Sequence, residues 1–355
     1  MSATAAQRFL QDAAEKSADL VHRELIRRGM ESYDAAHLKG RARIKDWEAA
    51  RQKCQDVKRE AINHLDRYLL QFEEKVISRG GHVFWAANGE EACAYVKNLA
   101  TRLGVRTVVK SKSMVTEEIH LSPVLEKVGI KVWETDFGEY IVQLRDEPPY
   151  HIVTPAMHLN RGQIAKLFRE KVDPGIDSDD PAYLMAAARR KLRQAFFAAE
   201  MGISGANFLV ADAGVIAIST NEGNGRLCTS VPRIHVVVTG IEKVIPRLED
   251  LAVLWPVLAT SGTGQGITTY HTDRWSAPTG RGRWTRRIPC GAGGQRTQPV
   301  AGRCGAARGA ALYSLWRLLE YLSSFPPRWR TYLWHDLSWT DRQRPYAASG
   351  RDQGV

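Results

Sequence analysis

The sequence predicts an α/β fold preceded by N-terminal helices. From residue 82 onward, short apolar runs rich in β-branched residues alternate with longer amphipathic segments. This alternation is typical of a largely parallel sheet with helices on its faces. With 355 residues, 44% of them hydrophobic, the chain can bury the core of one large or two ordinary domains.

The N-terminal region, residues 1–79, contains two segments with helical periodicity, 4–30 and about 41–79. Each has an apolar stripe that can pack against the following domain or against a partner. The first twenty residues carry acids and lack the apolar core of a signal peptide, and no run of about 18 apolar residues could span a membrane. Five scattered cysteines suit a reducing compartment. We therefore expect a cytoplasmic protein.

An α/β domain is predicted over residues 80–260. Strands are expected over 82–87, 106–110, 131–135, 151–155, 207–212, 215–220 and 236–240. Helices are expected over 89–103, 114–129, 138–144, 160–172 and 181–202, with a further helix after the last strand. Residues 261–271 read as a linker.

A polar, Gly-rich loop over residues 221–226 separates two of these strands. Asn221, Glu222, Asn224 and Arg226 offer donors and acceptors, and the glycines allow close approach of the backbone to a ligand. A loop after a strand of an α/β sheet is where ligands bind, which makes this the first candidate site. The alternative is an ordinary hairpin loop held by its own hydrogen bonds.

Two further groups of polar residues follow strands. Lys110, Lys112 and Ser113 come at a strand end and before a helix, where they could receive an anion such as a carboxylate. The alternative is a solvated turn.

Glu134, Asp136 and Glu139 follow the next strand. They could act in acid–base chemistry, or mark a helix N-terminus favoured by its dipole. His151, His158 and His235 lie among apolar neighbours and are expected to be structural. No Ser-His-Asp or Cys-His arrangement is legible, and no G-x-G-x-x-G follows a strand before residue 260. The catalytic residues therefore stay unassigned.

Several motifs resemble, in order and spacing, the LUD domain of bacterial lactate-utilization proteins. They are residues 110–114 (KSKSM), 117–118, 134–144 (ETDFGEYIVQL), 151–158 with Arg161, the NEGN loop and the GIEK turn at 240–243. The resemblance spans roughly residues 80–258 and implies a fold similar to sugar-phosphate isomerases and CoA-transferases. The N-terminal helices are similar to those of the longer, iron–sulfur member of the family.

This resemblance implies a cytoplasmic subunit that acts with two other lactate-utilization subunits in oxidising L-lactate to pyruvate. Its [4Fe–4S] clusters would relay electrons, and a small carboxylate would be the substrate. The alternative is a small-molecule or CoA-ester-binding module without a redox role.

The tail, residues 272–355, differs in composition from the rest of the chain. It holds 14 Arg, no Lys and 5 acids, so it carries +9 of the net charge of +11, and six of the ten tryptophans. A disordered basic tail or a nucleic-acid-binding segment with interleaved Arg and Trp would fit. A third interpretation, translation in the wrong reading frame, explains more.

Tryptophan has the single codon TGG, so reading one base later converts all six tail tryptophans to glycine. The same shift can convert Leu312, Leu315, Leu318 and Leu322 to cysteine. Their spacing then gives C-x2-C-x2-C-x3-C, the signature of a ferredoxin-type [4Fe–4S] site. As written, the tail has only Cys290 and Cys304, both off that spacing. We therefore expect a frameshifted tail that binds no cluster, no metal and no nucleic acid.

Overall fold

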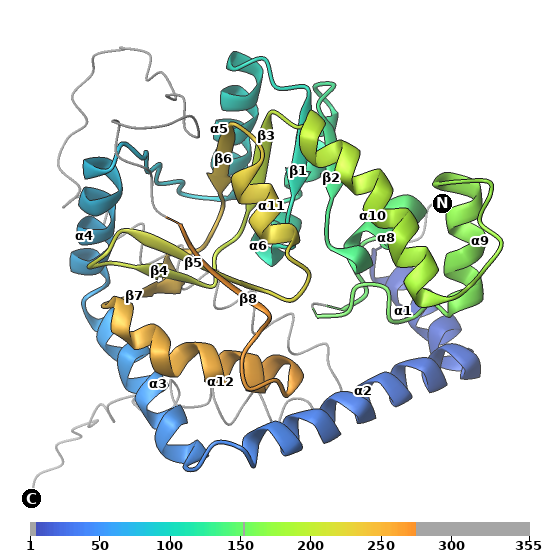
Figure 1. The fold of residues 1–355 in the computed structure, drawn as a ribbon, viewed down its shortest axis with the longest axis horizontal. Helices are drawn as coiled ribbons and strands as arrows, with labels where there is room; N and C mark the ends of the chain where they lie inside the picture. The colour runs from blue at the N-terminus through green and yellow to red at the C-terminus, as the bar shows by residue number, and fades with distance from the viewer. Residues whose placement is uncertain (1–4, 152, 275–355) are drawn as a thin grey trace, which may run out of the picture. The chain divides into compact units, whose positions relative to one another are not determined.

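The computed structural model describes residues 5–151 and 153–274, which form two sheets and the helices that cover them (Figure 1). The first sheet is entirely parallel, with strand order β2-β1-β3-β6. Its strands are β1 (Thr107–Lys110), β2 (Lys131–Glu134), β3 (Met201–Ser204) and β6 (Ile234–Val237). The parallel sheet with its helices confirms the predicted α/β class.

Helices cover both faces of the first sheet, because successive side chains of a strand point to opposite sides. Val108 packs in a core with α5 (Gly89–Arg102) and α7 (Leu121–Glu126). Val109 packs in the opposite core with residues of α8 (Phe137–Arg145), α9 (Arg161–Lys171), α10 (Pro181–Ala198) and α11 (Asn224–Ser230). The short helix α6 (Met114–Glu118) follows β1.

The second sheet has the order β7-β4-β5-β8 and is mixed. Its strands are β4 (Phe208–Val210), β5 (Val215–Thr220), β7 (Val244–Ile245) and β8 (Tyr270–Arg274). β4 and β5 form an antiparallel hairpin whose turn contains Gly214 at φ +58°. A side chain there would also meet the backbone of α4, so glycine is required twice over.

Four helices precede the α/β region: α1 (Ala5–Ala18), α2 (Leu20–Arg41), α3 (Trp47–Asn63) and α4 (Leu65–Ser78). The expected helix over 4–30 is divided because the Asp19 side chain caps α2, accepting a hydrogen bond from the His22 N–H at 2.9 Å. Val57 of α3 and Phe72 of α4 belong to the cores of the second sheet. α3 and α4 are thus part of the folded body.

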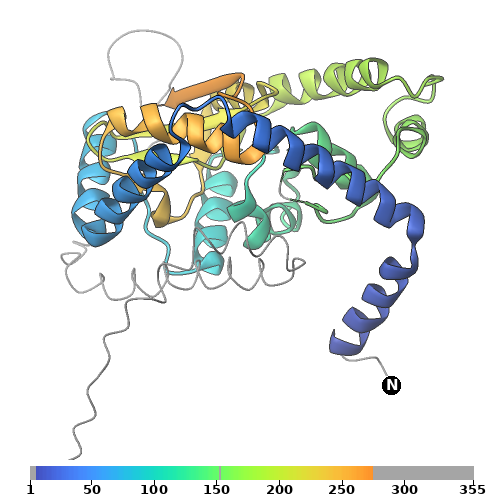
Figure 2. The same ribbon diagram turned by 90° about the horizontal axis from the view of Figure 1, so that it is seen from below.

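α12 (Leu251–Thr263) packs on the second sheet and lies beside α2 (Figure 2). Two short 3-10 turns, η1 (Ile241–Lys243) and η2 (Leu248–Asp250), precede it. The approach to α2 is close: a Cβ atom on Gly40 would lie 2.7 Å from the Gly264 carbonyl oxygen. Among the described residues, no helix combines the length and apolar character needed to cross a bilayer.

Two expected strands are wrong. Residues 82–87 form no strand, and Phe84 instead stacks on Tyr95 of α5 with ring centroids 4.0 Å apart. Residues 151 and 153–155 form no strand either, because His151 Nδ1 accepts hydrogen bonds from the Val153 and Thr154 N–H groups in a tight turn. In the expected strand over 151–155, residue 152 lies outside the described residues.

Three expected elements have different limits in the structure. The helix expected over 114–129 is divided at His120, which adopts the left-handed conformation at φ 53°. The helix expected over 181–202 ends at Ala198, and its last residues form β3 instead. The loop expected over 221–226 runs into α11 from Asn224. The predicted boundary at 271/272 falls within β8, which pairs with β5 through Arg274.

Candidate functional site

The end of β1 places the Lys110 side chain in a cluster of carboxylates. Its Nζ atom lies 2.7 Å from Glu117 Oε1, 2.9 Å from Glu134 Oε2 and 3.9 Å from Glu139 Oε2. The three acids come from α6, β2 and α8, which meet at the carboxyl ends of two neighbouring parallel strands. The Lys110 side chain is fully buried, and Glu117 is the most exposed of the three acids, with 29% of its side chain exposed.

Burial and charge oppose each other in this cluster. Burial alone would lower the pKa of Lys110, but the attraction of the three carboxylates outweighs it and raises that pKa. Burial raises the pKa of Glu134, and it raises the pKa of Glu139 to about 9, with the Lys110 charge opposing both shifts. Lys110 is therefore the counterion of an internal acidic group, charged at neutral pH.

A second group of charges lies at the N-terminus of α8. Asp136 caps the helix, accepting hydrogen bonds from the Gly138 and Glu139 N–H groups at 3.0 and 3.2 Å. Glu222 accepts another from the Phe137 N–H at 3.1 Å. Lys112 Nζ lies 3.6 Å from Asp136 Oδ2.

Contacts of Lys112 leave part of its ammonium group available. Its Nζ donates to the Val153 carbonyl at 2.7 Å, and its side chain is 25% exposed. The distance to Asp136 is longer than a hydrogen bond. The pKa of Glu222 is raised by burial and by the Asp136 charge, and Lys112 partly offsets this shift. This cation and two acids form the more accessible of the two charged groups.

The remaining residues of the Gly-rich loop turn toward other elements. Asn221 pairs with Gln265 after α12 at 2.9 Å, and its oxygen accepts from the Thr269 N–H at 3.0 Å. The Arg226 guanidinium lies over the Tyr270 ring, 5.2 Å from its centroid. Asn224 is buried at the start of α11, where its side chain accepts from the Gly225 N–H.

Each histidine expected to be structural has a hydrogen-bond partner. His235 Nε2 lies 2.8 Å from Ser204 Oγ across β3 and β6, and His158 Nε2 lies 3.1 Å from Glu147 Oε2. His151 accepts backbone N–H groups of its own turn. Within residues 5–151 and 153–274, no group of three His, Cys, Asp or Glu side chains has the arrangement of a metal site.

Comparison with known proteins identifies the family. The LUD domain matches residues 69–284 of this chain. The chain belongs to the LUD domain family. Lactate utilization protein B of Bacillus pumilus (strain SAFR-032) is 41% identical over 266 residues, which cover 75% of this chain and 56% of that protein. Lactate utilization protein B of Bacillus cereus (strain AH820) is 43% identical over 235 residues, 66% of this chain and 50% of that protein.

The chain spans about half the length of the curated relatives it matches. No solved structure matches it.

The predicted site residues therefore lie in four places in the structure. Lys110 and Glu134 join the buried cluster, and Lys112, Asp136 and Glu222 meet at the N-terminus of α8. Asn221, Asn224 and Arg226 lie at the start of α11 and beside β8. Ser113 caps α6, accepting the Thr116 N–H at 3.4 Å.

Glu117 is a residue of the buried cluster that was not predicted from the sequence. It lies seven residues after Lys110, on the helix that follows the strand, and α6 returns its carboxylate to the strand end. The signal was a pair of acids, Glu117 and Glu118, just after the basic motif. A lysine buried at a strand end needs a carboxylate, and the next helix is the nearest source.

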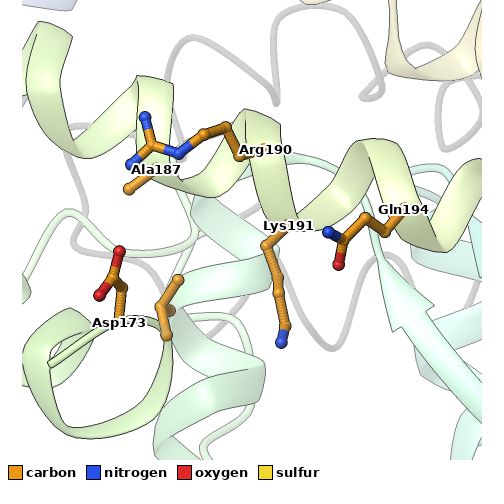
Figure 3. A pocket seen from close by; sticks show the side chains of 6 residues that line it. Asp173, Ala187, Arg190, Lys191 and Gln194 are labelled. Atoms are coloured by element: carbon orange, nitrogen blue, oxygen red, sulfur yellow. The ribbon is translucent and has the colours of Figure 1, made fainter.

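A hollow of about 260 Å³ lies elsewhere in the LUD domain, between α9 and α10 (Figure 3). Arg190, Lys191 and Gln194 of α10 line it together with Asp173, which follows α9. The hollow is open to solvent on one side, and none of the predicted site residues lines it. The chemistry of the predicted motifs lies instead at the ends of β1 and β2.

Proposed function

We propose that this chain supplies the LUD-domain part of a lactate-utilization protein, and that its LUD domain binds a small carboxylate, lactate or pyruvate. The names of its relatives support a role in lactate utilization. The chemistry at the N-terminus of α8 supports the carboxylate. We further propose that it acts with two other lactate-utilization subunits.

The observation that carries the carboxylate proposal is the state of Lys112. An ammonium group has three donors, and one of them goes to the Val153 carbonyl at 2.7 Å. Since the Asp136 contact, at 3.6 Å, is no hydrogen bond, donors remain for a bound carboxylate. Lys110 offers no such place, because its charge already faces three acids.

Asp136 and Glu222 give this place a second chemical character. Both carboxyl groups lie at the first turn of α8, where backbone N–H groups orient them. A 2-hydroxy acid would present a carboxylate to Lys112 and a hydroxyl group to one of these acids. Pyruvate would keep the first contact and lose the second, because its keto oxygen donates no hydrogen bond.

Electron transfer is the part of the proposed function that lies beyond the described residues. A [4Fe–4S] cluster supplies one-electron relay and needs four thiolates converging on one cube. The free cysteines of the described residues, Cys54, Cys93 and Cys228, come from separate elements and do not fit that need. The cysteine motif would come from the other reading frame of the tail, which lies outside the described residues.

Titration calorimetry of the full chain with lactate, pyruvate and a CoA ester tests the carboxylate proposal. Lys112→Met should weaken lactate binding by about 10- to 100-fold, since a hydrogen bond to a charged group contributes about 1.5–3 kcal/mol. Lys127→Met is the matched control, because Lys127 is exposed and lies at the far end of α7. Binding of the CoA ester alone would favour the alternative of a CoA-ester-binding module. Equal lactate binding by both variants would refute the role of Lys112.

A further inference from the structure

Glu134 and Glu139 lie against each other at the buried end of β2 and the first turn of α8. Three of their four carboxylate oxygens, Glu134 Oε2 and both oxygens of Glu139, are buried without a hydrogen-bond partner. Glu134 Oε2 forms an ion pair with Lys110 Nζ at 2.9 Å. Both carboxyl groups lie within 4 Å of the same Lys110 Nζ, and they hydrogen-bond to each other when one of them carries a proton.

We propose that Glu134 and Glu139 share one proton and form a buried proton-holding site of the LUD domain, with Lys110 as its fixed positive charge. Two carboxylates in contact cannot both be ionised in a buried place without severe repulsion. A proton between them turns two unsatisfied acceptors into a donor and an acceptor. The shared proton is expected whatever ligand the domain binds, so this proposal does not depend on the lactate proposal.

The charge balance of the cluster requires this proton. Three ionised acids around one lysine would leave two uncompensated negative charges, and only Glu117 is exposed enough to share its charge with water. Buried charges without a partner are very costly, and such groups take up a proton instead. With one proton on the pair, the charge of Lys110 compensates Glu134, and the one remaining negative charge lies on Glu117, the most exposed of the three acids.

The proton resides mainly on Glu139. Its carboxylate is 3.9 Å from Lys110 Nζ, whereas Glu134 is 2.9 Å away and also accepts from Ser122 Oγ at 3.3 Å. The negative charge of Asp136, on the same turn, further favours the neutral form of Glu139.

Two other titratable groups face the pair. Glu117 of α6 adds negative charge, which favours the proton on the pair. Cys228 of α11 lies near Glu134 and Lys110, but burial raises the pKa of its thiol to about 12, so it stays neutral and does not compete for the proton. Neither Glu117 nor Cys228 therefore removes the proton from Glu134 and Glu139.

The position of the pair links it to the charged edge of the domain. The Glu139 N–H donates to Asp136, and Asp136 is the acid that faces Lys112. An anion bound at Lys112 would add negative charge near the pair and strengthen its hold on the proton. This consequence rests on the proposed carboxylate site, whereas the shared proton does not.

Infrared spectroscopy of the full chain at pH 7 tests the shared proton directly. The wild type should show the carbonyl stretch of a buried protonated carboxylic acid. Glu139→Gln should remove this band, and Glu170→Gln, an exposed acid of α9, should keep it. Absence of the band from the wild type would overturn the proposal, and this result needs no variant that folds.

A second variant separates a shared proton from a single buried acid. Glu134→Gln leaves Glu139 as the buried acid facing Lys110 without a competing carboxylate, so Glu139 should ionise and the band should disappear. A band that persists in Glu134→Gln would overturn sharing. Calorimetric unfolding at pH 7 should release about one proton more from the wild type than from Glu139→Gln, because the unfolded carboxyl group is ionised at that pH. Equal proton release would count against the proposal as well.

Discussion

Lys110→Met is the substitution that should most clearly separate stability from ligand binding in this domain. Methionine keeps an unbranched chain that can occupy the buried space, but it removes the charge. Glu134 is then left buried without its counterion, since the lysine ammonium lies 2.9 Å from its carboxylate. Removing one partner of a buried ion pair costs about 3–5 kcal/mol. We expect the lower end of this range, because the Glu117 side chain, 29% exposed, can turn to water and Glu139 is already neutral.

The loss should depend on pH. Without Lys110, the pKa of Glu134 in the folded state rises further above its unfolded value, so the native state binds a proton that the unfolded state releases. The stability of the variant therefore falls as the pH rises from about 4.5, the ordinary pKa of a glutamate, toward the raised pKa of Glu134 in the folded state. Lys110→Met should approach the wild type near pH 5 and differ most from it above pH 7.

Urea denaturation followed by circular dichroism at pH 5, 7 and 8.5 measures this difference. Lys112→Met is the matched control two residues away, with a side chain 25% exposed and a 3.6 Å ion pair. Such a pair contributes about 0–1 kcal/mol, and the lost hydrogen bond to a carbonyl about 1 kcal/mol more. A Lys110→Met variant no less stable than Lys112→Met, or one whose deficit is the same at all three pH values, would refute the reasoning.

Three further predictions concern packing, acidification and the gene. Gly202→Ala should destabilise the domain by about 1–3 kcal/mol or more, because a Cβ there would lie 1.9 Å from the Cys228 carbonyl oxygen. Gly262→Ala in α12 is the control: a Cβ there would meet open space, so the urea midpoint should change little or rise. Burial lowers the pKa of His158. Below about pH 6.5 the unfolded state therefore binds a proton at this histidine more readily than the folded state does. In urea titrations, acidification from pH 7.5 to 5.5 should destabilise the wild type more than His158→Gln. Sequencing of the source DNA across codons 265–280 should show a missing or extra base.

The charged edge of the first sheet could be predicted from the sequence because parallel strands end together. Lys110 and Glu134 close two apolar runs, and β1 and β2 are parallel neighbours that pair these two residues. The rule that ligands meet the carboxyl ends of such strands also placed Lys112 and Asp136. What the sequence left open was which lysine faces inward, since that depends on acids supplied by helices.

Tertiary packing explains the elements that were missed. β3 is four residues long and contains a glycine, so its sequence continued the pattern of α10, and only pairing with β1 and β6 defines it. Residues 82–87 have the composition of a strand, but Phe84 finds its partner on α5 rather than in a sheet. Strand propensity mainly expresses packing, so it fails where an aromatic side chain packs elsewhere.

The Gly-rich loop illustrates a subtler limit. All its polar residues were expected to act together, yet only Glu222 reaches α8. Gly223, at φ +74°, turns the chain into α11 immediately afterwards, and the side chains on either side of it therefore point to different elements. A glycine in the middle of a polar run is the sequence feature that allows such a division, because glycine readily adopts the left-handed conformation.

β8 limits where a change of reading frame can fall. Residues Tyr270–Arg274 pair with β5 in continuous register, from Thr220↔Tyr270 to Ile216↔Arg274. The match to the LUD domain continues to residue 284. A pairing strand belongs to the original frame, so the base change should lie at or just after the codon of residue 274, because a shift that converts all six tail tryptophans has to precede Trp275 and Trp284. A base change before codon 270 would make the strand and the match coincidental, and would refute this placement.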